Sequence, residues 1–408
     1  MRLSAFCKEL VCAGHKAEVV TAMPHHPIGR IFPKYRGCFY RREFQGGVKV
    51  HRVWLSATGG SGLSRILNYI SFMLTCMIAL LKTAKPDFIF VDSPPIFLGI
   101  PGWIASTLWR CPFIFNVADL WPDSVRDLGI LKDGLFLQAA NMLEKWIYRS
   151  ADYITVVTDG IRDVLLAEKQ IPASKLLFLP NGVDTELFRP GTADEQLKAR
   201  LGLSGKRIIL YAGNHGYAAG AEQILQAAKL LSQHLEFQFI FIGDGPEKPK
   251  LRALSEDLCL RNVSFLDSVA LHELPKFLSI AEIAVISLRR AGVTRGARPA
   301  KAFVMMAAAL PIVLAAEGEP ERLIQAAESG LIVPPDEPRK LAAALLKLMS
   351  NPALASGMGA RGREFVRDYF EWSVLVRAWL SQLREKTNFD ISREATYEPS
   401  VHKSPVSL

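Results

Sequence analysis

Two short apolar segments, each followed directly by glycines, constrain the fold of this chain most strongly. The segment "RIILYAGNHG" begins at Arg207 and "FQFIFIGDGP" begins at Phe237. Continuous apolar runs of this kind are typical of strands that are covered on both faces of a parallel sheet. An amphipathic helix is expected after each strand, at 221–231 and at 247–258. The pattern therefore predicts repeated strand–helix units of the α/β class.

The same alternation continues through almost the whole chain and predicts two α/β domains in tandem. Each is expected to be a doubly wound parallel sheet, and the two are expected to face a shared cleft at the carboxyl ends of their strands. The predicted boundaries give an N-terminal domain at 1–175, a C-terminal domain at 176–361, a last helix at 362–386 that returns to the first domain, and a disordered tail at 387–408.

The first predicted element is a helix with no strand before it. Residues 2–13 have apolar side chains at helical spacing, and a strand is expected next, at 16–21. A helix that packs on a parallel sheet normally follows a strand of that sheet. The sequence therefore predicts that the first strand of the N-terminal domain is missing, with a misplaced or lost start as the favoured reason. A decayed gene and another segment in the same position are the alternatives.

Composition restricts the compartment and the cofactors. The six cysteines are scattered, with no CxxC pair, which predicts reduced thiols in a cytoplasmic protein and no structural metal. No signal peptide is expected. The apolar run 66–81 has 16 residues, fewer than the roughly 20 that a membrane-spanning helix needs. A buried helix is the first interpretation of this run, and a helix that enters the membrane surface is the second.

Positive charge is concentrated in the first part of the chain. The net charge is +9, and between Arg30 and Arg52 seven basic residues accompany one acid, Glu43, with aromatic residues interleaved. An anionic membrane or a phosphate-bearing substrate would suit this stretch, and a solvated basic loop is the alternative. Nucleic acid is not expected, because no recognition motif accompanies the basic residues.

Three loops of the second domain are expected at the carboxyl ends of its strands. Their candidate ligand-binding residues are Gly213, Asn214, Gly216 and Gly220 in the first loop, Gly243, Asp244 and Gly245 in the second, and Glu317, Glu319 and Glu321 in the third. Glycines at a strand–helix junction let backbone N–H groups approach an anion, and Glu319 or Glu321 could accept hydrogen bonds from ribose hydroxyls. The alternatives are tight turns for the glycines and a favourable helix dipole for the acids.

A resemblance to a known family rests on longer motifs. They are "PNGVDTELFRP" (180–190), "YAGNHG" (211–216), "FIGDGPEKPKLRAL" (241–254), 262–288 and 311–338. With them the chain resembles the family 4 glycosyltransferases of the two-domain GT-B fold, up to about residue 385. "HRVWL" (51–55), "SPPIFLGIPG" (93–102) and "DLWPDSVRDLGIL" (119–131) are similar to a bacterial O-antigen and capsule subgroup that contains WbuB-like N-acetyl-L-fucosamine transferases.

The resemblance implies a reaction and a role for each domain. It implies a UDP-linked sugar as donor, retention of the anomeric configuration, no metal and no further cofactor. The C-terminal domain would hold the nucleotide, with the base near Gly243–Pro246 and the diphosphate at the amides of Gly213–Gly216 beside Lys301. The N-terminal domain would hold a glycan acceptor linked to polyprenyl diphosphate, at the inner face of the cytoplasmic membrane. Asp119 would be the catalytic candidate and would contact the transferred sugar, with a turn or helix-cap acid as its alternative; Arg41 and Arg42 would lie on the acceptor side.

The chain also departs from the family pattern. Residue 1 aligns within the first helix of the family, whose preceding strand is central in its sheet. In "RPAKAFVMMAAALPIV" (298–313) Val304 stands where the family has the Glu that binds the ribose, and Leu310 stands where a glycine is usual. His215 and Tyr217 occupy the phosphate loop in place of an Arg/Lys pair. The expected function is glycosyl transfer; a catalytically impaired binding protein and a nucleotide-sugar 2-epimerase are the alternatives.

Overall fold

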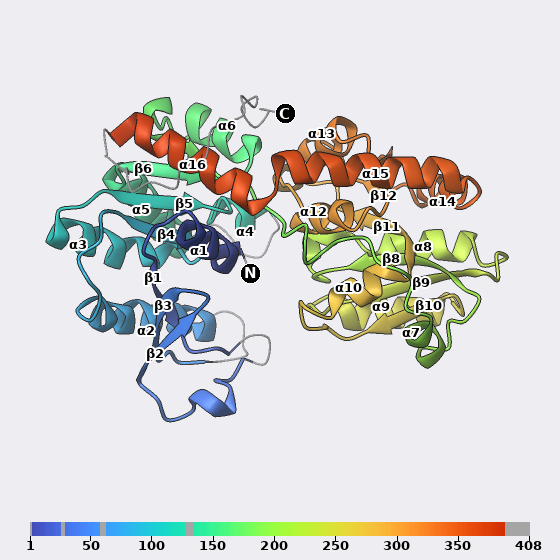
Figure 1. The fold of residues 1–408 in the computed structure, drawn as a ribbon, viewed down its shortest axis with the longest axis horizontal. Helices are drawn as coiled ribbons and strands as arrows, with labels where there is room; N and C mark the ends of the chain where they lie inside the picture. Colours follow the sequence, from blue (N-terminus) through green and yellow to red (C-terminus); the bar gives the residue numbers. More distant parts are fainter. Residues whose placement is uncertain (1, 26–28, 58–62, 128–133, 388–408) are drawn as a thin grey trace. The chain divides into compact units, whose positions relative to one another are not determined.

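The structure is a computed structural model that describes residues 2–25, 29–57, 63–127 and 134–387. These residues form two compact units. Unit 1 contains Met1–Val157, Ile161–Pro180 and the described residues from Val376 on, and unit 2 contains Thr158–Gly160 and Asn181–Leu375. Figure 1 shows the elements of both units.

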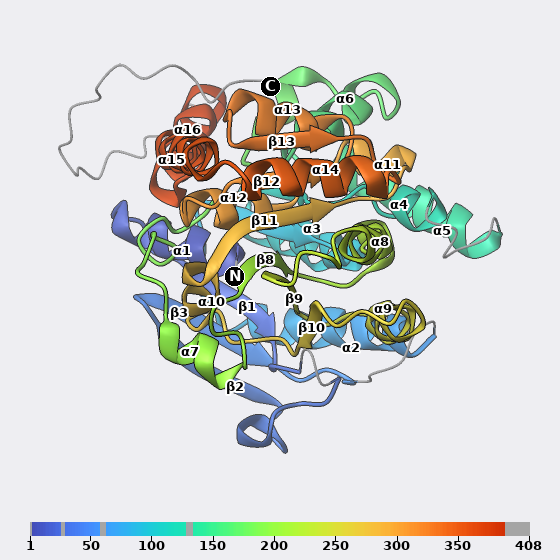
Figure 2. The same ribbon diagram turned by 90° about the vertical axis from the view of Figure 1, so that its right-hand side faces the viewer.

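Unit 2 is built on one parallel sheet of six strands in the order β10-β9-β8-β11-β12-β13. Figure 2 shows the strands in this order. Their bounds are β8 Arg207–Ala212, β9 Phe237–Ile242, β10 Val263–Leu266, β11 Ala281–Ser287, β12 Ile312–Ala315 and β13 Gly330–Val333. The chain therefore winds outward from β8 in one direction and from β11 in the other, which is the doubly wound arrangement that the apolar strands predict.

Helices cover both faces of this sheet. One face carries α8 (Glu222–Leu230), α9 (Lys248–Asp257) and α14 (Pro338–Met349), and the other carries α12 (Ala300–Ala307), α13 (Glu319–Ala326) and α15 (Pro352–Tyr369). The shorter helices of the unit are α7 (Glu195–Arg200), η4 (Tyr217–Ala219), α10 (Leu274–Ser279) and α11 (Gly292–Arg295). Because both faces are covered, every residue of β9 is buried, and the sequence there is continuously apolar except for Gln238.

Unit 1 contains two sheets. The first has the order β1-β3-β2, with β1 (Glu18–Ala22) parallel and β2 (Tyr40–Gln45) antiparallel to β3 (Val48–Val53). The second is parallel, with the order β4-β5-β6-β7, and its strands are β4 Ile89–Ser93, β5 Phe113–Val117, β6 Tyr153–Val156 and β7 Leu176–Phe178. The helices are α1 (Arg2–Cys12), α2 (Leu63–Leu80), α3 (Gly99–Trp109), α4 (Asp123–Asp127) and α5 (Leu135–Ser150), with single turns at η1 (Pro33–Tyr35), η2 (Ile96–Leu98) and η3 (Ala173–Lys175). Two further helices, α6 (Asp159–Ala167) and α16 (Trp372–Thr387), have their first residues in unit 2 and the rest in unit 1.

The break between the two sheets lies where the sequence predicts a missing strand. In the described part of the chain β1 pairs only with β3, and β4 pairs only with β5. By the strand order of unit 2, a strand that preceded α1 would lie between β1 and β4. The guanidinium of Arg2 in α1 donates hydrogen bonds to Asp92 Oδ1 (3.0 Å), at the end of β4, and to Asn116 Oδ1 (3.0 Å) in β5. One side chain thereby ties the first helix to the carboxyl end of the second sheet.

Two predicted boundaries differ from the structure. The predicted division at 175 would place β7 in the second domain, but β7 pairs with β6, so its apolar side chains complete the core of unit 1. The predicted last helix at 362–386 is two helices, α15 and α16, because the chain breaks at Phe370 and Glu371. Trp379 of α16 is fully buried against Phe6 and Phe90 in unit 1. The predicted tail lies outside the described residues.

The apolar run 66–81 is the helix α2, and it is only half buried. Thr75, Cys76 and Ala79 are buried, and α2 packs against β1 and β3. Large apolar side chains on the opposite side of the helix are exposed. None of the described helices has both the length and the apolar character that crossing a membrane requires.

Candidate functional site

The two glycine loops of unit 2 follow the carboxyl ends of β8 and β9 and pack directly on each other. Gly213, Gly243 and Gly245 have φ values of +145°, +139° and +154°, a backbone conformation that side chains disfavour. A Cβ on Gly243 would collide with the carbonyl oxygen of Gly213, and one on Gly245 would lie 2.5 Å from the carbonyl oxygen of His215. Both glycines are therefore needed for the close contact between the loops.

The backbone amides of these loops fall into two groups. The N–H of Gly213 donates to Ile242 O (2.9 Å), and the N–H of His215 donates to Asp244 O (2.9 Å). The amides of Asn214 and Gly216 have no acceptor among the described residues. The prediction that the amides of Gly213–Gly216 face an anion therefore fits only Asn214 and Gly216, because the other two join the loops together.

Asp244 and Gly245 form a small turn at the end of β9. The carboxylate of Asp244 accepts a hydrogen bond from the N–H of Gly245 (2.8 Å), and the Asp244 side chain is exposed. Lys248, at the start of α9, is buried and fixes the same loop: its ammonium donates to Gly243 O (2.8 Å), Leu266 O (3.0 Å) and Asp267 Oδ1 (2.8 Å). Lys248 thus uses its three donors to hold the second loop in place.

Lys301 is the one predicted cation of the site, and it lies beside the first glycine loop. Its Nζ is 4.2 Å from the centre of the Tyr211 ring, and a Cβ on Gly213 would lie 3.3 Å from its Cδ. Within the described part of the chain, the ammonium has no hydrogen-bond acceptor and no ion-pair partner. Burial lowers the pKa of Lys301 to about 8. The loop therefore has a desolvated cation next to two unpaired amides, which is the chemistry that an incoming anion would stabilise.

His215 is buried inside the loop. Its ring stacks on Tyr211 with centroids 5.4 Å apart and also lies near Phe241. Neither ring nitrogen has a hydrogen-bond partner among the residues that the structure describes. Burial, helped by the nearby charges of Lys248 and Lys301, lowers the pKa of His215 to about 4, so the imidazole is neutral at neutral pH. His215 acts as an aromatic filler of the loop and cannot supply the positive charge of the absent Arg/Lys pair.

Glu319 has a structural role that the sequence did not indicate. Its side chain is fully buried, and its carboxylate accepts hydrogen bonds from the N–H groups of Asp159 (3.2 Å) and Gly160 (2.8 Å). The guanidinium of Arg298, also buried, lies 2.6 Å from the same carboxylate and 3.3 Å from the carboxylate of Asp159. Since both oxygens of Glu319 are occupied, the predicted contact of Glu319 with a ribose does not fit this arrangement.

Glu321 lies in the first turn of α13. Its carboxylate accepts a hydrogen bond from the N–H of Gly318 (3.3 Å), the residue before the helix. The alternative interpretation of these acids, a favourable position at a helix N-terminus, describes Glu321 well. Glu317 pairs with Arg290 at 3.3 Å.

The structure shows the surroundings of Val304 and Leu310, two positions at which the sequence departs from the family pattern. Val304 is partly buried and packs against the apolar core of unit 2, so no carboxylate is present at this position of α12. Ala309, rather than Leu310, has the left-handed conformation that favours glycine, with φ of +56°. Leu310, which the resemblance places at the glycine position, is an ordinary buried side chain.

Asp119 of unit 1 follows the carboxyl end of β5. Its carboxylate accepts a hydrogen bond from the hydroxyl of Ser124 (3.0 Å) at the start of α4, and burial raises its pKa. Raised pKa values of this kind are common among carboxylates with a chemical role, and a carboxylate that holds the start of a helix would have the same contacts. Both interpretations of Asp119 given by the sequence therefore remain open.

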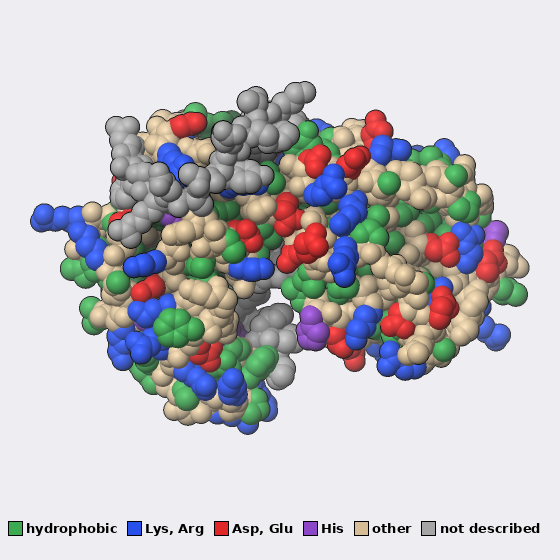
Figure 3. Space-filling view, viewed as in Figure 1, with side chains coloured by type: hydrophobic (Ala, Val, Ile, Leu, Met, Phe, Trp, Pro, Cys, Tyr) green, Lys and Arg blue, Asp and Glu red, His purple; other side chains and the backbone are tan. Residues whose placement is uncertain are grey.

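The basic stretch of unit 1 is partly neutralised by its one acid. Glu43 binds Arg52 at 2.7 Å and Arg41 at 3.3 Å, and both guanidinium groups lie within 5.5 Å of the centre of the Tyr35 ring. Arg42 is exposed on β2. Figure 3 shows Lys and Arg side chains gathered over the part of unit 1 formed by β2 and β3. Of the two predicted acceptor-side arginines, only Arg42 projects freely into solvent.

Two residues of the site region were missed by sequence reasoning. Lys248 and Arg298 are both buried cations whose partners are distant in the sequence or belong to the backbone. A lysine within "GDGPEKPK" reads as part of a solvated helix face, and no local pattern shows that it returns to Gly243. Only the packing of the loops determines these contacts.

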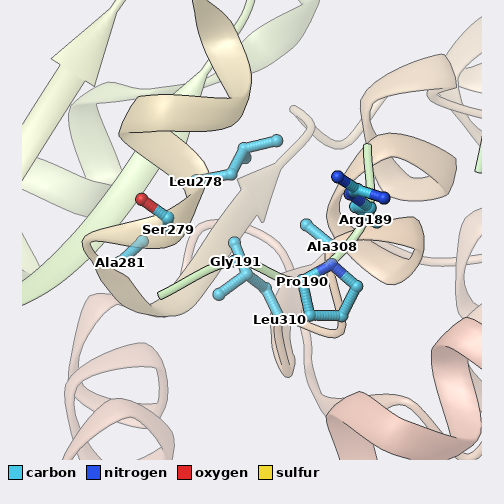
Figure 4. Close-up of a pocket in the computed structure, with 8 residues that line it drawn as sticks. All are labelled: Arg189, Pro190, Gly191, Leu278, Ser279, Ala281, Ala308 and Leu310. Atoms are coloured by element: carbon cyan, nitrogen blue, oxygen red, sulfur yellow. The ribbon is translucent and has the colours of Figure 1, made fainter. Parts of the chain in front are cut away.

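A separate pocket lies at the opposite edge of the sheet of unit 2. Figure 4 shows it lined by Arg189, Pro190, Gly191, Leu278, Ser279, Ala281, Ala308 and Leu310. Ala281 begins β11 and Leu310 precedes β12, so the pocket is at the amino ends of the strands. The glycine loops follow the carboxyl ends of parallel strands, and the pocket is therefore not part of the candidate site. No cluster of His, Cys, Asp and Glu able to hold a metal is found in the described ranges.

Comparison with known proteins decides the family. A model of the "Glycosyl transferase 4-like domain" matches residues 1–182, and a model of "Glycosyl transferases group 1" matches residues 193–365. The chain belongs to the glycosyltransferases of family 4. The first match falls on unit 1 and the second on unit 2, so the loops described above are those of a glycosyltransferase.

Curated relatives agree with this assignment. The putative colanic acid biosynthesis glycosyl transferase WcaI of Escherichia coli is 27% identical over 321 residues, which cover 76% of this chain and 78% of the relative. The probable glycosyltransferase WbjE of Pseudomonas aeruginosa is 30% identical, over 56% of this chain and 58% of its own length. These matches support a glycosyltransferase of bacterial polysaccharide or glycolipid biosynthesis.

Solved structures show the same fold. The sucrose-phosphate synthase of Thermosynechococcus elongatus matches with a TM-score of 0.72 and 20% identity, over 94% of this chain and 92% of that one. WaaG, a glycosyltransferase of lipopolysaccharide biosynthesis, matches with a TM-score of 0.65 and 14% identity, over 95% of each chain. The two Rossmann-like units of this glycosyltransferase therefore have the GT-B fold.

Proposed function

We propose that this glycosyltransferase moves a sugar from a UDP-linked donor to a lipid-linked or glycan acceptor of a cell-surface polysaccharide, with retention of configuration and without a metal. The observation that carries the proposal is the ammonium of Lys301, unpaired among the described residues, which lies beside Gly213 in the loop that also holds the free amides of Asn214 and Gly216. A departing nucleoside diphosphate develops negative charge, and fixed N–H groups with a desolvated cation are suited to stabilise it.

Two known proteins bear on the identity of the nucleotide. A structurally similar chain, Anabaena HepE, was crystallised with UDP, whereas a mycobacterial relative that is 26% identical is named as a GDP-mannose-dependent mannosyltransferase. The base would lie near Gly243–Pro246, where the exposed Asp244 offers a hydrogen-bond acceptor. We favour UDP, and GDP is the alternative that the experiment below distinguishes.

The acceptor is assigned to unit 1. We propose a glycan on polyprenyl diphosphate, held at the inner face of the cytoplasmic membrane, with Arg42 near its diphosphate. Asp119 is proposed to contact the transferred sugar, because its raised pKa and its position after β5 suit a carboxylate that receives hydroxyl groups.

Calorimetric titration of the purified chain with UDP and with GDP tests the donor site. UDP is expected to bind, and Lys301→Met is expected to weaken binding by about tenfold to a hundredfold, the loss of one charge-assisted contact. Lys250→Met is the matched control, because the Lys250 side chain is 73% exposed on the same unit. Binding of GDP alone would replace UDP in the proposal, and no heat with either nucleotide at millimolar concentration would refute the donor site.

A second candidate function is favoured by one observation. Val304 gives α12 an apolar side chain where the resemblance places the ribose-binding carboxylate, so the chain would suit a relative that binds nucleotide-sugars but transfers slowly. Val304→Glu distinguishes the two functions. A gain of at least tenfold in transfer or in UDP affinity would show an impaired ancestral site, whereas unchanged or lower values would show that this enzyme works with valine. The epimerase alternative has no support, since both family models are those of glycosyltransferases.

A further inference from the structure

Unit 1 has an exposed apolar face formed by α2, α3 and α5. On α2 the exposed side chains are Leu67, Ile70, Leu74 and Ile78, and Leu81 follows just beyond the helix. Their spacing of three or four residues places them in one stripe along the helix. On α3 Trp103 and Leu108 are exposed, and on α5 Met142 and Trp146 are exposed. We call these side chains together the α2–α3–α5 face.

The three helices lie on the same side of the sheets of unit 1. The helix α2 connects β3 to β4, α3 connects β4 to β5, and α5 lies between β5 and β6, so the chain advances in one direction across the strands. Right-handed crossovers then place all three on one side. The helices contact one another in the order α2, α3, α5, and the Trp103 and Trp146 rings are 5.2 Å apart across the last pair. Figure 1 shows them in this order.

The exposed charges within the described part of these three helices are all positive. The helices α2 and α3 contain no acidic residue, and the one acid of α5, Glu144, is buried and bound to Lys169 at 2.7 Å. Exposed charges on or just beyond these helices are five basic residues, Lys82, Lys85, Arg110, Lys145 and Arg149, and two acids, Asp87 and Asp152. Basic residues therefore predominate. Exposed leucine, methionine and tryptophan with basic residues beside them are the composition that binds the interface of an anionic bilayer.

We propose that the α2–α3–α5 face docks on an anionic lipid bilayer. The apolar stripe of α2 would enter the headgroup region, and the lysines and arginines would meet lipid phosphates. An exposed apolar surface of this extent requires an occupant. A second protein with an acidic rim is disfavoured because the basic residues are spread along the helices and do not form a local ion-pair site. The inference deepens the proposed function, since a lipid-linked acceptor lies in a membrane.

The face includes α2, the apolar run 66–81 whose second interpretation is a helix that enters the membrane surface, and it differs from the other membrane candidate of the sequence. The basic and aromatic stretch between Arg30 and Arg52 has its acid Glu43 bound to two arginines, and Arg41 and Arg52 lie against Tyr35. Two of its seven basic residues are therefore paired within the stretch itself. The α2–α3–α5 face has no comparable internal partner for its basic residues among the described contacts.

Flotation of the full chain with lipid vesicles tests the proposal. Vesicles of phosphatidylcholine with about one-third phosphatidylglycerol are expected to carry the chain upward, and pure phosphatidylcholine is expected to carry much less. The double variant Leu74→Glu with Ile78→Glu is expected to lower the bound fraction by at least about tenfold, since two apolar side chains are lost from the interface. Leu235→Glu is the control, because Leu235 is also an exposed apolar side chain but belongs to unit 2.

Three results would overturn the proposal. The first is that the original chain does not bind anionic vesicles. The second is that Leu235→Glu lowers vesicle binding as much as the double variant does. The third is a dimer in size-exclusion chromatography that Leu74→Glu with Ile78→Glu dissociates, in a chain that does not bind vesicles. The last result would assign the face to a second copy of the chain. Thermal unfolding checks that the variants fold. UDP titration of the same samples keeps the two proposals separate, because donor binding in unit 2 does not depend on vesicles.

Discussion

The unpaired ammonium of Lys301 predicts a specific pH dependence of nucleotide binding. Burial lowers the pKa of Lys301 from 10.5 to about 8, so the free protein loses this charge at a pH where an ordinary lysine keeps it. A bound diphosphate favours the protonated form and raises the pKa again. Nucleotide affinity should therefore be constant below pH 8 and decrease above it.

The size of the decrease follows from the titration alone. With a pKa of about 8, about nine-tenths of the free protein carries the charge at pH 7 and about one-tenth at pH 9. The affinity for UDP is then expected to fall by about tenfold between these two values. The same titration affects folding. Between pH 8 and 10.5, Lys301 is protonated in the unfolded chain and deprotonated in the folded chain. The contribution of Lys301 to the free energy of unfolding should therefore increase with pH in this range.

Calorimetry at several values between pH 7 and 9 measures the effect, with two variants as references. Lys301→Arg keeps its charge throughout and should bind with little pH dependence. Lys301→Met should bind weakly at every pH and reports the titration of all other groups, those of the nucleotide included. The reasoning would be refuted by a constant affinity in the original chain, or by a tenfold decrease that persists in Lys301→Arg.

Three further predictions concern the surroundings of the site. Glu319→Gln removes the negative charge that pairs with the buried Arg298 and should lower the free energy of unfolding by about 3 kcal/mol. Glu321→Gln, at a helix end, should change the free energy of unfolding by less than about 1 kcal/mol. Chemical denaturation measures both values. Ala309→Gly removes the Cβ that disfavours the left-handed conformation at φ of +56° and should raise the free energy of unfolding by about 1 kcal/mol, which is measured as a higher melting temperature. A lower melting temperature would contradict the conformational argument. Excess EDTA should leave sugar transfer unchanged in an assay with radiolabelled donor, and a loss that Mg²⁺ restores would show a metal requirement.

The strands of unit 2 could be predicted from the sequence because burial on both faces requires apolar residues at every position. "FQFIFI" and "RIILYA" carry that requirement in the residues themselves, and the glycines after them mark the turns. The division at 175 could not be placed correctly for a physical reason: β7 is only three residues long, and no local sequence pattern shows that it pairs with β6.

The site could be predicted in part. Glycines 213, 243 and 245 are visible in the sequence because the backbone approach excludes side chains, and Lys301 was placed by the resemblance. Glu319 was misassigned, because a carboxylate at a strand–helix junction has the same sequence pattern whether it binds a ligand or a buried guanidinium. The difference depends on Arg298 and Gly160, the second of which is far away in the chain.

Thr158–Gly160 belongs to unit 2, although the residues before and after this segment belong to unit 1. This assignment affects whether unit 2 can be produced as a separate fragment. A fragment that starts at Asn181 would contain Glu319 and Arg298 but neither of the amides that occupy the carboxylate, and would leave water or a misplaced side chain to take their place. Such a fragment should be harder to express than its sheet suggests. Limited proteolysis should therefore cleave this fragment faster than the same residues in the full chain, because two hydrogen bonds to a buried carboxylate are lost.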